Sequence, residues 1–138
     1  MSAGESRRDA RRQAVFLLYQ EDITGLSLSE LVENAERERG FGLNDFTQEV
    51  VNGVSASRVR IDELIDRAAA GWSVDRMAPL ERNIMRVAVH EMLGRDDIPD
   101  AVAIDEAVNL AKRYCQTDAS GFVNGVLGAV VRGEEAAS

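Results

Sequence analysis

The sequence predicts an all-α protein, a compact bundle of about seven helices that forms one domain over residues 1–138. Apolar residues make up 45% of the chain and recur at three- and four-residue steps, the spacing of helices that bury one face. No stretch alternates apolar and polar residues between turn signals, so we expect no β-sheet. Two prolines and 5% aromatic residues are also unlike a β-sandwich with many turns. The ends, residues 1–6 and 133–138, are expected to be flexible.

The first two helices are indicated by their apolar faces and by signals at their ends. Arg7–Tyr19 is predicted as a helix whose apolar side chains gather on one side, and Gly25 ends this unit. Ser27 and Glu30 match a capping box, in which two side chains satisfy backbone groups at a helix start. A short amphipathic helix therefore begins here and runs to about Arg39.

A single long helix is predicted in the middle of the chain. Residues 40–44, GFGLN, form a loop, and apolar side chains then recur at helical steps from Asn44 towards Ala70. Gly71 is expected to stop this helix. Ser73 is expected to cap a single turn that follows.

Three further signals mark the helices of the C-terminal half. Pro79 suits the first turn of a helix, which Gly94 closes. After a turn, the helical pattern returns over residues 101–114. Asp118 is the expected N-cap of the last helix.

Charge is distributed unevenly along the chain. The formal net charge is −8, yet the first 20 residues hold four arginines against two acidic residues. The remaining 118 residues hold 12 basic and 22 acidic side chains. A general nucleic-acid binder is basic overall, so we expect this chain to bind a polyanion only at a local site. The acidic remainder suits a basic protein partner.

The local basic site is the arginine cluster near the start of the chain, formed by Arg7, Arg8, Arg11 and Arg12. Their spacing predicts guanidinium groups along one strip of a helix, and the planar guanidinium fork suits phosphate oxygens. Positive charge at a helix N-terminus opposes the helix macrodipole, so four arginines there indicate a use beyond helix stability. A solvated helix start is the alternative interpretation.

A second cluster lies in DASGFVNGVLG, residues 118–128. Its three glycines are poor helix formers, so we expect the backbone here to approach another helix or a ligand closely. Asn124 has apolar neighbours in the sequence, and its amide needs partners. Phe122 belongs either to the core or to a platform for an unstacked base.

Catalytic and metal-binding chemistry is not indicated. His90 and Glu91 are adjacent, so on a helix they do not face each other as an acid–base pair, and His90 is expected at the surface or half-buried. Cys115 is the only cysteine, which excludes an internal disulfide and zinc sites of the usual Cys/His spacing. We expect no cofactor and no metal. A lone cysteine and the absence of an apolar run of about 20 residues favour a cytoplasmic protein without membrane association.

The chain resembles the family of bacterial transcription antitermination proteins called NusB. The segments that carry the resemblance are RRDARRQAVFLLYQ, ERNIMRVAVHEML, DIP, VAIDEAVNLAKRY and DASGFVNGVLG. They occur in the family's order and spacing over nearly the whole chain, and DEAVNLAKRY followed by FVNGVL is the most specific part. Residues 21–60 match only by pattern, so nothing specific is carried over there.

The resemblance implies a NusB-like fold of two small packed helical bundles and a non-enzymatic function. It implies binding of boxA, an element of single-stranded nascent RNA in ribosomal RNA leaders, jointly with NusE, a small-subunit ribosomal protein. That complex helps RNA polymerase, with other Nus factors, to read through terminators. The implied RNA-binding residues are Arg7, Arg8, Arg11, Arg12, Lys112, Tyr114, Asp118, Phe122 and Asn124, and the implied NusE-binding residues are Tyr19 and Glu81.

The implied RNA site predicts how RNA affinity depends on salt and on substitutions. If four arginines each neutralise one phosphate, log K falls against log salt with a slope of about −3. Replacing Arg11 and Arg12 with alanine is expected to leave the fold intact and to flatten that slope. Asp9 interrupts the cluster, which is expected to lower RNA affinity.

Two other functions stay open from sequence alone. One is an RNA-binding domain remnant of a ribosomal RNA cytosine methyltransferase, since NusB-like domains also occur fused to such enzymes. The other is a protein-only helical adaptor whose arginines contact acidic partners. A homodimer that covers the RNA surface also stays open, because the apolar faces and the Gly-rich last helix suit self-association.

Overall fold

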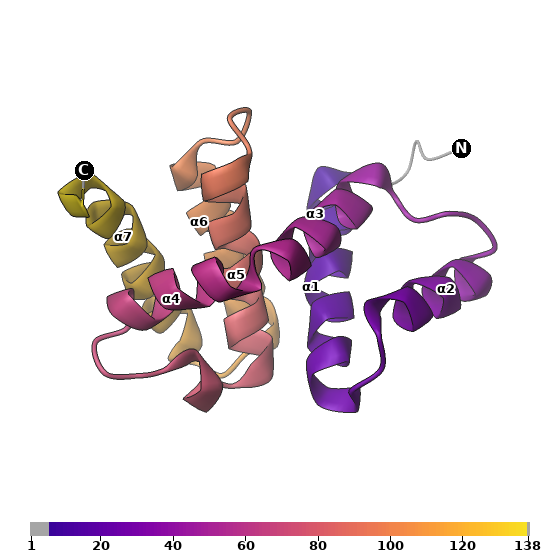
Figure 1. Ribbon diagram of the computed structural model, residues 1–138, viewed down its shortest axis with the longest axis horizontal. Coiled ribbons are helices and arrows are strands. Elements are labelled where there is room, and N and C mark those ends of the chain that lie inside the picture. Colours follow the sequence, from indigo (N-terminus) through magenta and orange to yellow (C-terminus); the bar gives the residue numbers. More distant parts are fainter. Residues whose placement is uncertain (1–5, 138) are drawn as a thin grey trace.

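The computed structural model describes residues 6–137, and the side chains of residues 6–133. Within residues 6–137 there is no β-strand, and seven α-helices are joined by short loops (Figure 1). The helices are α1 (Arg7–Thr24), α2 (Leu28–Arg39), α3 (Asp45–Ala56), α4 (Arg58–Ala68), α5 (Pro79–Gly94), α6 (Asp100–Tyr114) and α7 (Ala119–Ala137), with a 3₁₀ turn η2 (Val74–Arg76) before α5. The predicted all-α class and the expected number of helices are confirmed. Of the ends expected to be flexible, residues 1–5 and 138 lie outside the described residues, and residues 133–137 belong to α7.

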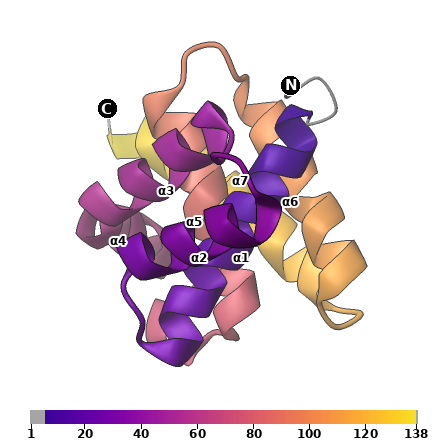
Figure 2. The ribbon, with the colours of Figure 1, turned by 90° about the vertical axis from the view of Figure 1, so that its right-hand side faces the viewer.

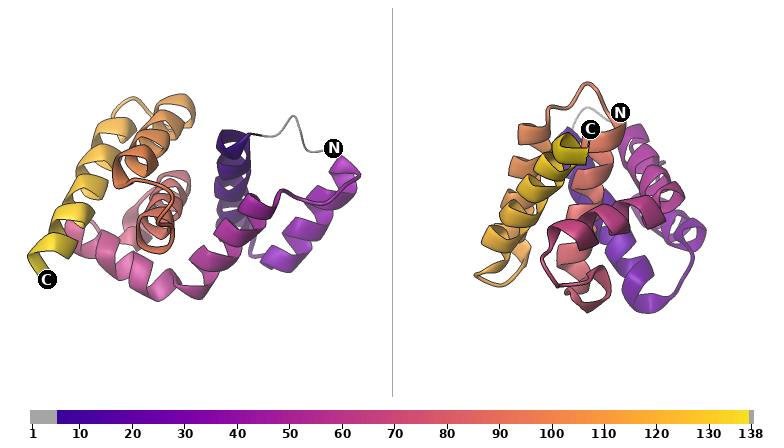
Figure 3. Two further views of the ribbon diagram at one scale, coloured as in Figure 1. Left: turned by 90° about the horizontal axis from the view of Figure 1, so that it is seen from above. Right: turned by 60° about the vertical axis from the view of Figure 1, so that its left-hand side comes forward.

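The helices form two sub-bundles, which agrees with the two packed bundles that the sequence led us to expect. The helices α1, α2 and α3 make the first, and α4 to α7 make the second (Figure 1). Seen from above, α1 stands between α2 and the second sub-bundle (Figure 3), and α2 covers α1 from the outside (Figure 2). Packing of α1 and α3 against α5 joins the two halves.

Several helix ends form as their sequence signals predict. The chain leaves α1 through Gly25, whose φ of 76° lies in the left-handed region that favours glycine. The Ser27 hydroxyl accepts a hydrogen bond from the N–H of Glu30 and donates one to its carboxylate, so the predicted capping pair starts α2. Pro79 occupies the first turn of α5, where its missing N–H costs no helical hydrogen bond.

The prediction of one helix from Asn44 to Ala70 is wrong, because the chain breaks at Ser57 into α3 and α4. Ser57 has φ −113° and ψ 19°, outside the helical region. The break lets the two segments bury different faces: α3 packs on α1 and α5, whereas α4 packs on α5 and α7. A continuous apolar repeat cannot reveal such a change of partner, since both segments keep helical spacing.

The turn after α4 is not capped by the residue that the sequence predicts. Ser73 precedes η2, but its side chain makes no capping hydrogen bond. Instead the carboxylate of Asp66, at the end of α4, accepts a hydrogen bond of 2.7 Å from the N–H of Val74. A side chain from the preceding helix therefore anchors this turn in place of the local serine.

A network of ion pairs holds α1 and α4 against α5. The carboxylate of Asp22 in α1 accepts hydrogen bonds from Arg82, Asn83 and Arg86 of α5. Arg86 also donates two hydrogen bonds, of 2.8 and 2.9 Å, to Asp62 of α4. Burial by itself would raise the pKa of Asp22, but its hydrogen bonds and the charges of the two arginines outweigh it and hold that pKa below its usual range.

Candidate nucleic-acid interface

Arg11 lies inside the protein, so the prediction of four arginines along one exposed strip is wrong. Its side chain is 6% exposed and forms two hydrogen bonds to Glu91 of α5, Nε to Oε2 at 2.7 Å and Nη2 to Oε1 at 2.6 Å. Glu91 is fully buried, and the pair ties α1 to α5. The sequence did carry the signal: Arg11 stands three and seven residues before Ala14 and Leu18, which are both buried, and therefore shares their face.

Arg8 remains at the surface, held by a carboxylate of α6. Its side chain is 73% exposed. It donates two hydrogen bonds to Glu106, Nε to Oε1 at 3.0 Å and Nη2 to Oε2 at 2.9 Å. These hydrogen bonds, and then the charge of Glu106, raise the pKa of Arg8. The pair fixes the direction of the Arg8 guanidinium without burying it.

Arg7 and Arg12 are also exposed in part, and each has a carboxylate partner. Arg7 Nη1 donates to Asp97 Oδ2 at 3.2 Å, across to the loop between α5 and α6. Arg12 Nη2 donates to Asp9 Oδ1 at 3.0 Å on the same helix. Asp9, which interrupts the arginine cluster in the sequence, is therefore the partner of one of its members. Whether this pair lowers RNA affinity stays a prediction.

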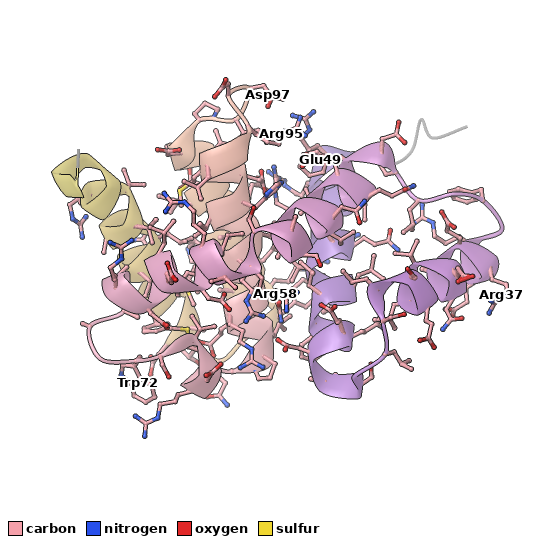
Figure 4. The ribbon with its side chains drawn as sticks, viewed as in Figure 1. Arg37, Glu49, Arg58, Trp72, Arg95 and Asp97 are labelled. Atoms are coloured by element: carbon pink, nitrogen blue, oxygen red, sulfur yellow. The ribbon has the colours of Figure 1, made fainter. Side chains whose placement is uncertain are left out.

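Sequence reasoning missed a cluster of charged side chains around the ring of Phe46 in α3. The guanidinium groups of Arg7, Arg95 and Arg11 lie 4.8, 5.0 and 5.5 Å from the ring centroid. Arg95, with Asp97 and Glu49 nearby, stands at one end of the molecule (Figure 4). Hydrogen bonds from Arg95, helped by one from Arg7, lower the pKa of Asp97 to about 2. No local motif marks this cluster, because its members come from three separate segments: α1, α3 and the loop between α5 and α6.

Side chains of α1 and α6 meet along one edge of the protein, and the two helices run in the same direction there. Arg8 meets Glu106 at one point, and Phe16 meets Tyr114 eight residues further along both helices. Eight residues of α-helix advance about 12 Å. We call this surface the α1–α6 edge; it consists of Arg8, Arg12, Phe16 and Tyr19 of α1 and Glu106, Lys112, Arg113 and Tyr114 of α6.

Aromatic rings occupy the part of the α1–α6 edge nearer the C-terminal ends of the two helices. Phe16 and Tyr114 pack edge to face, with ring centroids 5.1 Å apart and planes at 89°. Phe16 also contacts Tyr19, at 6.4 Å between centroids. The guanidinium of Arg113 lies 5.5 Å from the Tyr114 ring, and Lys112 is exposed beside it. Sequence reasoning named Tyr19, Lys112 and Tyr114 but missed Phe16.

Phe122 and Glu81, expected in different functions, line one shallow cavity at the start of α5 and α7. The cavity has a volume of about 300 Å³, and Trp72 and Arg76 are also in its wall. Trp72 is 57% exposed and stands on the loop between α4 and α5 (Figure 4). Phe122 is half-buried and packs against the core, and its role as a platform for a base stays a prediction. Burial raises the pKa of Glu81.

The Gly-rich face of α7 looks outward, contrary to one part of its prediction. A Cβ atom added at Gly121 or Gly125 would meet nothing within 4 Å, so no other helix approaches there. Asn124, expected among apolar neighbours, is exposed on the same face. Asp118 is exposed as well, directly before α7, and its carbonyl accepts a hydrogen bond from the N–H of Phe122.

The groups considered for catalysis have structural partners. His90 is half-buried, as expected, and its Nε2 lies 2.8 Å from Glu49 Oε2. Glu91 binds Arg11 on another side of α5. Burial raises the pKa of the Cys115 thiol, and the charge of Glu81 adds to that rise. No group of three metal-ligating side chains occurs among the residues that the structure describes, nor do these residues include a helix long and apolar enough to cross a membrane.

Together these features define a class of protein: a small helical bundle with arginine and aromatic side chains along one edge. The chain belongs to the NusB family, whose model matches residues 8–132. It is 43% identical to the transcription antitermination protein NusB of Thermobifida fusca (strain YX), covering 88% of this chain and 86% of that protein. Members of this family are non-enzymatic factors, and this chain is not an enzyme.

Solved structures of the family have the same fold. The structure of T. maritima NusB superposes with a TM-score of 0.82 at 30% identity and covers 93% of this chain and 92% of that chain. A crystal structure of the antitermination factors NusB and NusE in complex with dsRNA contains a chain that matches with a TM-score of 0.81 at 28% identity. That match covers 92% of this chain and 96% of the other.

Proposed function

We propose that this chain is a transcription antitermination factor that binds boxA RNA of ribosomal RNA leaders together with NusE. Membership of the NusB family supports the general function, and the solved complex of NusB, NusE and RNA supports both kinds of partner. In this proposal the bound protein–RNA complex acts on RNA polymerase jointly with other Nus factors, in the cytoplasm.

The α1–α6 edge is the observation that carries the proposal. Arginines at one end, exposed in whole or in part, suit the phosphates of single-stranded RNA, and partly exposed rings at the other end suit its bases. Because Arg11 is buried against Glu91, we assign the phosphate contacts to Arg7, Arg8 and Arg12 and give Arg11 a positioning role. Further RNA contacts are proposed for Lys112, Tyr114, Asp118, Phe122 and Asn124 at the end of α6 and on α7.

The acidic balance of the chain favours cooperation with a basic partner. A net charge of −8 repels RNA outside the local basic site, so we expect weak binding by this protein alone. A basic protein docked beside the site would weaken that repulsion and add phosphate contacts. We assign this docking to the side of Tyr19, which contacts Phe16, and Glu81, which lines the cavity with Trp72 and Phe122, and we propose NusE as the partner.

Fluorescence anisotropy with boxA RNA and a scrambled RNA, with and without NusE, tests the proposal. We expect preference for boxA and tighter binding when NusE is present. With three exposed arginines in place of four, the expected slope of log K against log salt is about −2. Equal affinities for both RNAs, with and without NusE, would contradict the proposal and favour a protein-only adaptor.

A pair of double variants separates the site from general charge effects. R8A/R12A removes two phosphate contacts and should reduce the slope to about −1. R60A/R67A removes two exposed arginines from α4 and serves as the matched control, since it changes the net charge equally. The helix α4 packs on α5 and α7, so the control should keep the wild-type slope. An equal loss in both variants would move the RNA site elsewhere.

A further inference from the structure

Phe16 is a large apolar side chain that the core does not use. It is half-buried on α1, and the buried core side chains and those packed on them do not include it. Its contacts with other rings are with Tyr114 and Tyr19, and Tyr114 is itself 37% exposed. Stability of the fold therefore gives little reason for a phenylalanine at this position.

Phe16 also stands at the border of a groove between α1 and α2. The groove has a volume of about 390 Å³, and its polar lining comprises the amides of Gln13, Gln20 and Asn34 and the charged side chains of Glu38 and Arg39. The Oε1 of Gln13 accepts a hydrogen bond from Arg39, and the Oδ1 of Asn34 accepts one from Arg37, which leaves the NH₂ groups of both amides to donate. Amides can donate to and accept from base edges, whereas an aromatic face accepts any base by stacking. The ring thus lies where the polar groove meets the α1–α6 edge.

Positive charge lies beside the aromatic cluster of Phe16, Tyr19 and Tyr114 on both helices. Arg8 and Arg12 lie one to two helical turns before Phe16 on α1, and Lys112 and Arg113 directly precede Tyr114 on α6. Cations beside the rings add nothing to the binding of an apolar peptide. In a nucleic acid, by contrast, the phosphates can pair with these cations while the bases stack on the rings. The charges therefore favour a nucleic acid over a protein as the occupant.

We propose that Phe16, supported edge-on by Tyr114, is a stacking platform for one unpaired base of the RNA, whose edge is read by the amides of the neighbouring groove. This inference rests on the proposed function and assigns to it a base-binding residue that sequence reasoning missed. It places the path of the RNA along α1, from the arginines towards the aromatic cluster.

The test replaces Phe16 with leucine and with tryptophan. Leucine keeps the apolar bulk and removes the ring, so F16L should bind boxA RNA, in the presence of NusE, about five-fold or more weakly than wild type. Tryptophan keeps a stacking face, so F16W should stay within about two-fold of wild type. Stacking involves no counterion release, so neither variant should change the salt slope, unlike R8A/R12A.

A double-mutant cycle combines F16L with a set of boxA RNAs, each of which lacks one base. At the position that stacks on Phe16, removal of the base should weaken wild-type binding and have no further effect on F16L. Additive losses at every position, or wild-type affinity in F16L, would overturn the inference. Loss of NusE binding by F16L, measured without RNA, would assign the platform to the protein partner and also overturn it. Failure of the wild-type complex to bind boxA at all would instead overturn the proposed function, and this inference with it.

Discussion

Replacing Arg11 with methionine tests whether this arginine holds the fold or contacts RNA. In the structure its guanidinium makes two short hydrogen bonds to the fully buried carboxylate of Glu91. Methionine has a similar length and no charge, so R11M leaves the Glu91 carboxylate buried without its partner. The sequence alone led to the opposite expectation, that alanine at this position leaves the fold intact.

The magnitude follows from the burial of both partners. Removing one member of a buried ion pair costs about 3–5 kcal/mol, because the other charge stays in a medium of low dielectric constant. A domain of this size has a total unfolding free energy of about 5–15 kcal/mol, so the loss is a large share of it. For a chain of this length we expect the melting temperature to fall by about 10–20 °C.

Urea denaturation followed by helical circular dichroism measures this loss. The double variant R11M/E91L replaces the whole pair with apolar side chains of similar size and should recover most of the stability. If R11M is as stable as the wild type, the pair does not carry the energy that its burial implies. If the folded double variant loses as much RNA affinity as R8A/R12A, Arg11 contacts RNA directly and its positioning role is wrong.

Three further predictions concern other parts of the molecule. G53A should lose about 1–3 kcal/mol in the same denaturation assay, because its Cβ would lie 2.1 Å from Cε1 of His90; the control G121A, at an open helical position, should be neutral or stabilised. E106Q weakens the ion pair with Arg8 and should raise RNA affinity by up to about five-fold in anisotropy titrations. A lower RNA affinity of E106Q would instead mean that Glu106 holds Arg8 in the orientation that binds RNA. The pKa of Asp22 is depressed, so this carboxylate contributes stability at neutral pH that is lost as pH falls below its ordinary pKa of about 4. D22N should therefore show a shallower loss of stability below about pH 4, and an unchanged acid slope would assign that loss to other carboxylates.

The parts of the fold that sequence reasoning could predict are those set by local chemistry. Gly25 and the pair Ser27 and Glu30 act within one or two turns of chain, and each forms the helix end that its residue type implies. The break at Ser57 depends on which neighbours the two halves of the segment meet. Those neighbours come from distant parts of the chain, so the apolar repeat of the segment continues across Ser57 and predicts a single helix.

The candidate site shows the same division. The arginine cluster is visible in the sequence as a local excess of charge, but the inward direction of Arg11 depends on Glu91, 80 residues further along the chain. In the sequence Phe16 stands in the apolar run 15–18, and the other three members of that run are buried. Only the fold, which brings Tyr114 of α6 next to α1, sets the two rings in contact at the surface.

The carboxylates that hold the arginines explain why the site should need a second source of affinity. Arg7, Arg8 and Arg12 each bind a carboxylate in the structure, so an RNA phosphate replaces an existing ion pair. Exposed pairs are worth at most about 1 kcal/mol, so exchange is easy but its net gain is small. A base that stacks on the aromatic cluster, or a phosphate that contacts a basic partner, does not have to displace one of these ion pairs. We therefore expect base removal at the stacked position and omission of NusE to weaken RNA binding more than the loss of any one of these arginines.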